Sequence, residues 1–385
     1  MRNIFATALF AAAAITAGAA DIDSIAAAIA SANPAVLARR AELRSASLAM
    51  SADGMLPGPE IEGEHLWGPA ADNRWGVGIS QSFDWPGVYA ARRGARRASA
   101  NAFVQLAHAE LAEQRLAAKL ALIDLVAARR EAAAVRGIYN NVQELLDLTR
   151  RALDHGQATI LDVRKLQIEQ LEVARRLEEA EQARAEAVAA LRAMGCDADV
   201  PDALDYPAAS AAYADAAARW MASPALMAAR AEAEASDARA KAAARSCLPG
   251  FSLGYRHQYE GGTHFNGISV GIALPAWGAS RSKAAARAEA EAARLQAESQ
   301  TAAAASQFDA MRRRVAALGE RLRAYDGALA TSDYPALLRK SLDGGQISVL
   351  TYIQELNFFM EARIAREQAA RDYHLALATL NKYSF

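Results

Sequence analysis

The chain has 385 residues, of which 53% are hydrophobic and only 7% aromatic, and alanine occurs in nearly every segment. This composition is typical of long packed helices. The formal net charge of −1 at pH 7 excludes a strongly basic nucleic-acid-binding protein, so we expect no nucleic acid among the partners.

The first twenty residues have the pattern of a secretory signal peptide. Arg2 supplies a positive start, an apolar stretch runs from Ile4 to Ile15, and Ala17-Gly18-Ala19 provides an A-x-A cleavage site. The apolar stretch is shorter than the roughly 20 residues that a helix needs to span a bilayer. We therefore interpret residues 1–20 as a signal peptide and not as a membrane anchor.

One unit of sequence occurs twice in the mature chain. Asn33–Glu42 returns as Ser223–Glu232, with the same proline and the same run of Ala, Arg and Glu. Three more landmarks recur in the same order: Leu56-Pro57-Gly58 as Leu248-Pro249-Gly250, Trp85-Pro86-Gly87 as Trp277-Gly278, and Leu153–Gln157 as Leu342–Gln346. The sequence therefore predicts a first repeat over 21–195, a linker over 196–219 and a second repeat over 220–385.

Each repeat is predicted to open with a helix, from Asp21 to Gly54 and from Trp220 to Cys247, that ends at a Leu-Pro-Gly stop. A β-hairpin follows over 59–85 and over 250–276, because apolar residues there alternate with small and polar ones. Each strand has about the 9 to 11 residues of a tilted membrane strand.

Segments rich in Gly, Asn and Asp are expected to link the strands of each hairpin. These segments are Gly68–Arg74 in the first repeat and Glu260–Asn266 in the second.

The pattern then changes to helix, and residues 89–194 and 280–383 are each predicted to form a helical hairpin. From Tyr89 to Leu153 there is no proline, and some 65 residues at 1.5 Å each make a rod of roughly 100 Å. Pro335 should kink or restart the matching helix of the second repeat. A three-and-four spacing on the first return helix predicts a coiled-coil seam formed by Val163, Leu166, Gln170, Val173, Leu177, Ala180, Ala187, Leu191 and Met194.

Four strands with an apolar face cannot close a barrel, and open sheet edges are not tolerated in lipid. Three chains would together supply twelve strands. The predicted fold class is therefore mostly α with a small membrane β part: a long α-helical coiled-coil barrel and a 12-stranded β-barrel that three chains share, four strands each.

Several of these segments resemble the TolC-like outer membrane factors, a family of trimeric efflux and secretion ducts. The resemblance rests on Asn33-Pro34 and Ser223-Pro224 at the repeat starts, on Ile79–Gly87 at the end of a strand, and on the turn glycines Gly156 and Gly345. The short length and modest loops look similar to the heavy-metal, cobalt-zinc-cadmium type branch.

The resemblance implies a homotrimer in the bacterial outer membrane, with its helical part in the periplasm. It implies passive conduction of small solutes, drugs or metal ions, in a tripartite efflux system. The implied partners are outer-membrane lipid, a periplasmic adaptor protein and an inner-membrane RND or ABC-type exporter, and no cofactor is expected.

Three sets of site residues follow from the resemblance. The adaptor would dock at the helical tips: Gly156, Gln157, Gly345 and Gln346. Family members narrow the periplasmic mouth with aspartates six and nine residues after the second tip glycine. In this sequence Thr351 and Gln354 occupy those positions, and they are the first gate candidates. The other two are Glu355, which follows Gln354, and Asp162, which lies six residues after Gly156 in the first repeat. Candidates for the membrane interface are Trp67, Trp75, Arg92, Arg93, Arg96 and Arg97. For the four arginines, the alternative interpretation is that they form a solvated helix face.

Other functions remain open. The duct could export a protein cargo in type I secretion, or the chain could be a non-conducting periplasmic coiled-coil scaffold. The sequence contains no catalytic or phosphate-binding motif, so we expect no enzyme. The six histidines are not spaced as metal ligands are, so they predict no metal site. Cys196 and Cys247 match no metal or redox motif. A disulfide between them is chemically possible after export.

Overall fold

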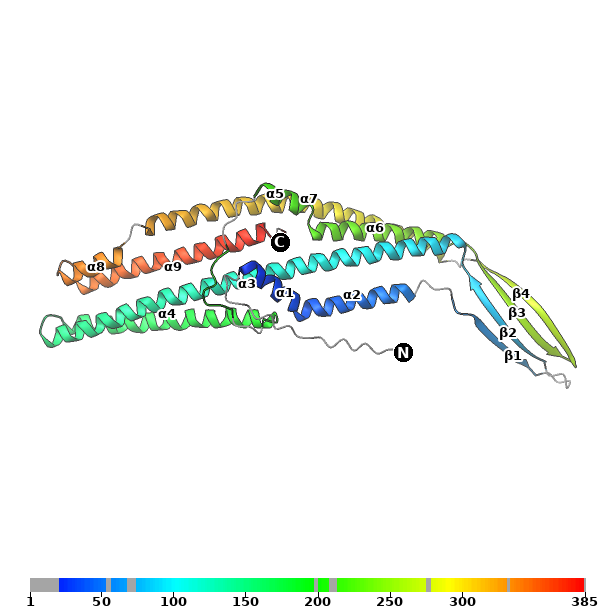
Figure 1. Ribbon diagram of the computed structural model, residues 1–385, viewed down its shortest axis with the longest axis horizontal. Helices are drawn as coiled ribbons and strands as arrows, with labels where there is room; N and C mark the ends of the chain where they lie inside the picture. The colour runs from blue at the N-terminus through cyan, green and yellow to red at the C-terminus, as the bar shows by residue number, and fades with distance from the viewer. Residues whose placement is uncertain are drawn as a thin grey trace. The chain divides into compact units, whose positions relative to one another are not determined.

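A computed structural model describes residues 21–52, 57–67, 74–196, 200–207, 213–274, 278–330 and 333–383 (Figure 1). The predicted signal peptide, Leu56, most of the first linking segment and Trp277 lie outside the described residues. The first repeat contains α1 (Ile22–Ala32), α2 (Pro34–Ala52), β1 (Glu60–Leu66), β2 (Arg74–Phe83), α3 (Pro86–Asp154) and α4 (Ile160–Ala193). The second contains α5 (Tyr213–Met221), α6 (Pro224–Arg245), β3 (Gly250–Glu260), β4 (Thr263–Ala273), α7 (Ala279–Leu329), α8 (Tyr334–Asp343) and α9 (Val349–Leu380).

The chain divides into two compact units, and each unit takes residues from both repeats. The first, the helical unit, comprises the residues up to Val36, Glu113–Ala216 and the residues from Asp309 onward. The second, the sheet unit, comprises Leu37–Ala112 and Ala217–Phe308. Among the described residues, no helix combines the length and the apolar composition needed to cross a membrane.

The helix that opens each repeat is broken, whereas we expected it to run without interruption from Asp21 to Gly54. Asn33 lies between α1 and α2 in an extended conformation (φ −57°, ψ 123°), as a residue that precedes proline must. Its side-chain oxygen accepts a hydrogen bond from the backbone N–H of Ala35 at 2.9 Å. In the second repeat Ser223 caps α6 in the same place, so the proline in each repeat begins a helix.

Pro335 has the predicted effect on the second long helix. The helix α7 ends at Leu329, and a separate helix, α8, starts at Tyr334 with Pro335 in its first turn. The matching helix of the first repeat, α3, is a single helix of 69 residues. Because proline removes a hydrogen-bond donor and clashes with the preceding turn, the two repeats differ at this point.

Two clusters of buried residues form the core of the helical unit. One joins the second half of α3 to α4, α8 and α9, and the other joins α1 to the middle of α3 and to the ends of α4 and α9. The predicted seam of α4 faces these clusters, with Leu166 fully buried. The seam residues that are buried are Val163, Leu166, Val173, Ala180 and Leu191. No disulfide joins Cys196 to Cys247, and Cys196 is buried just after the end of α4.

The four strands form one antiparallel sheet in the order β1-β2-β3-β4 (Figure 1). The central pairing of β2 with β3 joins the two repeats. The second hairpin turns at Gly261 and Gly262, both with positive φ (54° and 86°), which a two-residue hairpin turn requires. We expected a linking segment over Glu260–Asn266; strand β4 in fact begins at Thr263, because two glycines suffice for the reversal.

Gly254 lies where the sheet has no room for a side chain. A Cβ there would be 2.9 Å from the carbonyl oxygen of Ile79 and 3.0 Å from the Cβ of Ser80, whereas a Cβ at Gly267 would meet nothing within 4 Å. We expect Gly254→Ala to destabilise the sheet by about 1–3 kcal/mol, the usual cost of overpacking. The measurement is the midpoint of thermal unfolding by circular dichroism, and Gly267→Ala is the matched control. Equal midpoints for the two variants would contradict this prediction.

Candidate functional site

One face of the sheet is apolar and exposed. The pairing register places Ile61, Ile79, Tyr255 and Ile268 in one row across all four strands. Ile61 and Ile268 are 76% and 77% exposed, although isoleucine is usually buried. The exposed apolar residues of this face include Ile61, Trp75, Val77, Ile79, Phe83, Phe251, Leu253, Tyr255, Ile268, Val270 and Ile272.

The opposite face of the sheet is mostly polar and charged, with Leu66 and Phe265 as its large exposed apolar residues. Arg256 on β3 forms an ion pair with Glu62 on β1 at 3.2 Å. Gly78 on β2 lies between them in the register, and its missing side chain leaves space for the arginine to reach across. A second ion pair joins Arg74 to Glu260 at 3.5 Å. The sheet therefore separates an apolar side from a hydrated side.

Both edges of the sheet are open. Among the described residues, no further strand pairs with β1 or with β4. Unpaired backbone N–H and C=O groups at such edges bind other strands readily. A sheet with an exposed apolar face and two open edges can be completed by strands of other chains.

The predicted interface residues lie near the two ends of the sheet. Trp67 follows β1 at one end, where it is 82% exposed. Trp75, the second residue of β2, packs against His257 and Tyr259 at ring-centroid distances of 5.6 and 6.0 Å. The four arginines lie near the start of α3, which follows the other end of β2.

The arginines near the start of α3 differ in their environment. Arg92 forms an ion pair with Asp84 at 2.5 Å, and the Nε of Arg96 donates to the carbonyl oxygen of Arg92 at 3.4 Å. Arg93 and Arg97 are exposed. Two of the four cationic side chains therefore face solvent.

The two helical tips have the same turn. Gly156 and Gly345 adopt left-handed conformations, with φ of 70° and 66°. In each turn the glycine N–H and the following glutamine N–H bond back to the carbonyls of the preceding helix, to Leu153 and Ala152 in the first tip. This is a Schellman motif, which ends a helix at a glycine. All four predicted docking residues, Gly156, Gln157, Gly345 and Gln346, are exposed.

The tip glycines should tolerate alanine poorly. Because L-residues pay about 1–2 kcal/mol in the left-handed region, we expect Gly345→Ala to loosen the turn. Gly137, in the interior of α3 with open space around it, is the matched control, and Gly137→Ala should stabilise its helix by up to about 1 kcal/mol. Hydrogen exchange of the local amides measures both effects. Slower exchange at the tip of the Gly345→Ala variant would contradict the expectation.

Within the described ranges, no hydrogen bond joins any two of the gate candidates, and three of the four have a local partner instead. Asp162 forms a capping box with Thr159 at the start of α4, and these hydrogen bonds from the Thr159 side chain and backbone lower the pKa of Asp162. Thr351 occupies the same place in α9, where Ser348 is the cap. Ser or Thr three residues before a polar residue is a capping signature, and Thr159 and Ser348 carry it in the sequence.

The other two candidates also differ from each other. Gln354 is exposed on α9, whereas Glu355 is half-buried and accepts a hydrogen bond from the hydroxyl of Tyr334 at 2.5 Å. That bond raises the pKa of Tyr334 and ties α8 to α9. Gln354 is therefore the candidate with no capping or tethering contact among the described residues.

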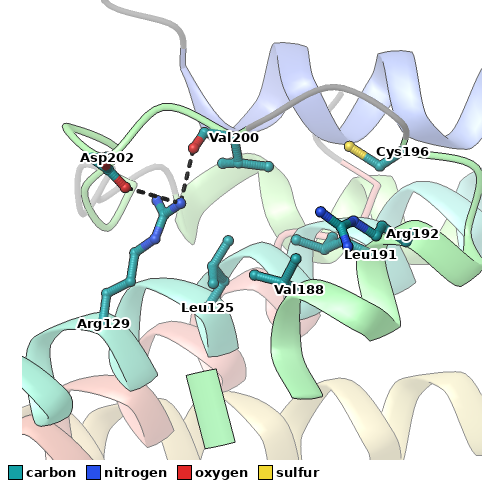
Figure 2. A pocket seen from close by; sticks show the side chains of 8 residues that line it. All are labelled: Leu125, Arg129, Val188, Leu191, Arg192, Cys196, Val200 and Asp202. Atoms are coloured by element: carbon teal, nitrogen blue, oxygen red, sulfur yellow. Dashed lines mark hydrogen bonds and ion pairs between the residues drawn. The ribbon is translucent and has the colours of Figure 1, made fainter. Parts of the chain in front are cut away.

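A small cavity of about 200 Å³ lies where the linker meets α3 and α4 (Figure 2). Figure 2 shows Arg129 directed toward Val200 and Asp202 of the linker. Its guanidinium donates to the carbonyl oxygens of Val200 and Pro201 at 2.9 and 2.8 Å and pairs with Asp202 at 3.4 Å. Cys196 also lines the cavity. Arg129 fastens the linker to α3, so we interpret the cavity as a product of this attachment.

The linker is also held by stacked rings. Tyr206 stacks on His374 of α9 with ring centroids 4.4 Å apart, and the guanidinium of Arg130 lies 4.7 Å from the centre of the tyrosine ring. Burial, followed by the charge of Arg130, lowers the pKa of His374 to about 4. Burial and the charge of Glu367 raise the pKa of Tyr206. The imidazole is therefore neutral at neutral pH.

Acid should release this attachment. When the linker detaches, the pKa of His374 returns toward the ordinary value of about 6.5, so the free form binds the proton more tightly. The stacked form is fully favoured above that value and loses stability as the pH falls from about 6.5 toward 4. Proteolysis of residues 200–207 should thus be faster at pH 5 than at pH 7. His374→Phe keeps the stack without a titrating group, and it should lose most of this pH dependence.

No family model and no curated protein matches the sequence. Solved structures do match the fold. A membrane protein from Pseudomonas aeruginosa is 17% identical with a TM-score of 0.77, and the match covers 94% of this chain and 93% of that one. The CmeC outer membrane channel of Campylobacter jejuni is 14% identical with a TM-score of 0.71, covering 94% and 85%. The outer membrane protein VceC of Vibrio cholerae is 15% identical with a TM-score of 0.70, covering 94% of each chain. The chain therefore has the fold of these membrane proteins, which confirms the predicted fold class.

Proposed function

We propose that the chain is one third of a homotrimeric efflux duct in the bacterial outer membrane, with its helices in the periplasm. The observation that carries the proposal is the four-stranded sheet, with one exposed apolar face, one charged face and two open edges. The similarity of fold to outer membrane channels supports the same function.

The sheet accounts for the trimer. Within lipid every backbone polar group needs a partner, so β4 of one copy must pair with β1 of the next until the ring closes. Three copies of a four-stranded sheet give twelve strands. A ring of eight is filled by its own side chains, whereas a larger ring leaves a lumen. The apolar face then meets lipid, and the face with Glu62 and Arg256 lines the lumen.

Exposed apolar residues on the helices support association of the same copies. On α4, Leu161, Ile168 and Leu171 are 66%, 68% and 73% exposed. Their spacing of seven and three residues places them on one side of the helix. Neighbouring copies in a closed helical barrel would cover this side.

The duct would conduct passively and catalyse no reaction. An inner-membrane RND or ABC-type exporter supplies the energy, and a periplasmic adaptor docks at the tips that carry Gly156 and Gly345. A narrow polar mouth near Gln354 would limit conduction, because Asp162 and Thr351 are engaged with the capping residues Thr159 and Ser348.

We also propose the two repeats and the removal of the signal peptide that the sequence indicates. Export would remove residues 1–20, and the mature chain would consist of the repeats over 21–195 and 220–385 joined by the linker. The short chain favours the heavy-metal branch, so metal ions are a proposed cargo beside drugs.

Arginine substitutions on the two faces of β4 test the proposal. Val270 and Ser269 are neighbours on opposite faces of this strand. An arginine in the lipid-facing band costs about 2–4 kcal/mol, so Val270→Arg should lose membrane-inserted trimer, whereas Ser269→Arg should keep the trimer and alter its conductance. The readouts are the detergent-extracted oligomer and currents across planar bilayers. A monomeric unmodified protein, or a trimer without current under any gating condition, would refute the duct.

A further inference from the structure

Two histidines meet on the β3–β4 hairpin, close to its turn. His257 on β3 and His264 on β4 have nearly parallel rings, with an interplanar angle of 25° and centroids 5.3 Å apart. The Nε2 atom of His257 lies 3.3 Å from the Nδ1 atom of His264. The pairing register explains this contact, since Tyr259 is opposite His264 and His257 is opposite Asn266. Diagonal neighbours on one face of a hairpin are within reach of large side chains.

Neighbouring side chains fix the orientation of the His257 ring. Its Nδ1 atom lies 2.7 Å from the Oδ1 atom of Asn266, which also accepts a hydrogen bond from the hydroxyl of Tyr255 at 2.7 Å. An amide oxygen only accepts hydrogen bonds, so Nδ1 of His257 carries the proton. The Nε2 atom then presents its lone pair toward His264. This is the arrangement by which proteins orient a metal-binding histidine.

We propose that His257 and His264 bind a divalent transition-metal ion of the zinc type at this end of the sheet. Two imidazole nitrogens on a tetrahedral ion, each at 2.0–2.1 Å, are about 3.3–3.4 Å apart. The two ring nitrogens already have that separation. The hydrogen between them moves to Nε2 of His264, so both ligand atoms are free to bind the ion.

The pair lies on the face that carries Tyr255 and Ile268, between that row and the turn at Gly261 and Gly262, and in the single chain it is open to ions from solution. His264 is exposed, and His257 is partly exposed. No group of three or more His, Cys, Asp or Glu side chains is placed to hold a metal within the described ranges, so water would complete the coordination. The ring of Tyr259 lies 5.0 Å from that of His264, and the ring of Trp75 lies 5.6 Å from that of His257. These aromatic neighbours restrict ring rotation and reduce the cost of ordering the ligands.

The metal site does not depend on the proposed duct. It uses one hairpin of one chain, at the end of the sheet opposite to the start of α3. If the chain assembles as proposed, the site would lie at the outer end of the barrel, away from the helices.

Zinc titration of the full-length protein in detergent tests the site. Isothermal titration with zinc chloride should give one saturable site per chain, and tetrahedral cobalt(II) in its place should give strong visible absorption. His257→Phe and His264→Phe keep an aromatic ring but remove the ligand, so each should abolish both signals. Asn266→Ala leaves the ligands in place and should weaken binding by about 10–100-fold.

His65→Phe is the matched control. His65 is on β1, opposite Trp75 of β2, and lies on the same face of the sheet as the pair. Its ring packs against that of Trp67, with centroids 4.8 Å apart. The control should bind zinc as the unmodified protein does. The proposal is overturned if the unmodified protein shows no saturable binding, or if His257→Phe, His264→Phe and His65→Phe bind zinc equally. Neither result bears on the trimer or on conductance.

Discussion

Backbone hydrogen bonds between β2 and β3 join the two sequence repeats, and the register of this pair fixes the rest of the sheet. With Ile79 opposite Tyr255, the apolar residues of all four strands fall on one face. A shift of one residue would turn each side chain of a strand to the other face and bury charge against lipid in the proposed duct. The same register places Gly78 between Glu62 and Arg256, so the charged face also depends on it.

In the helical unit, the two sequence repeats have the same turn at their tips but different long helices. Both tips end in a Schellman turn at a left-handed glycine, so the two repeats present the same exposed backbone there. The proline of the second repeat divides one long helix into α7 and α8, and Glu355 then ties α8 to α9 through Tyr334. In a trimer the tips would therefore alternate between a continuous helix and a jointed one. In the proposed duct, that difference would give the second repeat an additional point at which the mouth can bend.

Several polar residues that seemed functional in the sequence have local structural roles. Asp162 and Thr351 lie at the third position of a helix, where a capping side chain precedes them by three residues. Arg92, a candidate for the membrane interface, is paired with Asp84. In contrast, His257 and His264 had no apparent role until the strands were paired. Distance along the sequence was therefore a poor guide to which polar groups meet.

The sequence by itself determined the duplication, the strand alternation from Trp75 to Phe83, the α4 seam and the break at Pro335. These features depend on local periodicity or on the covalent restriction of proline, which any chain shows wherever it folds. Only the tertiary structure decided the register of β2 on β3, the two-glycine turn that shortens the expected linking segment, and the contact between His257 and His264. Contacts between distant residues depend on which backbone groups pair across the sheet, and composition and spacing do not encode that choice.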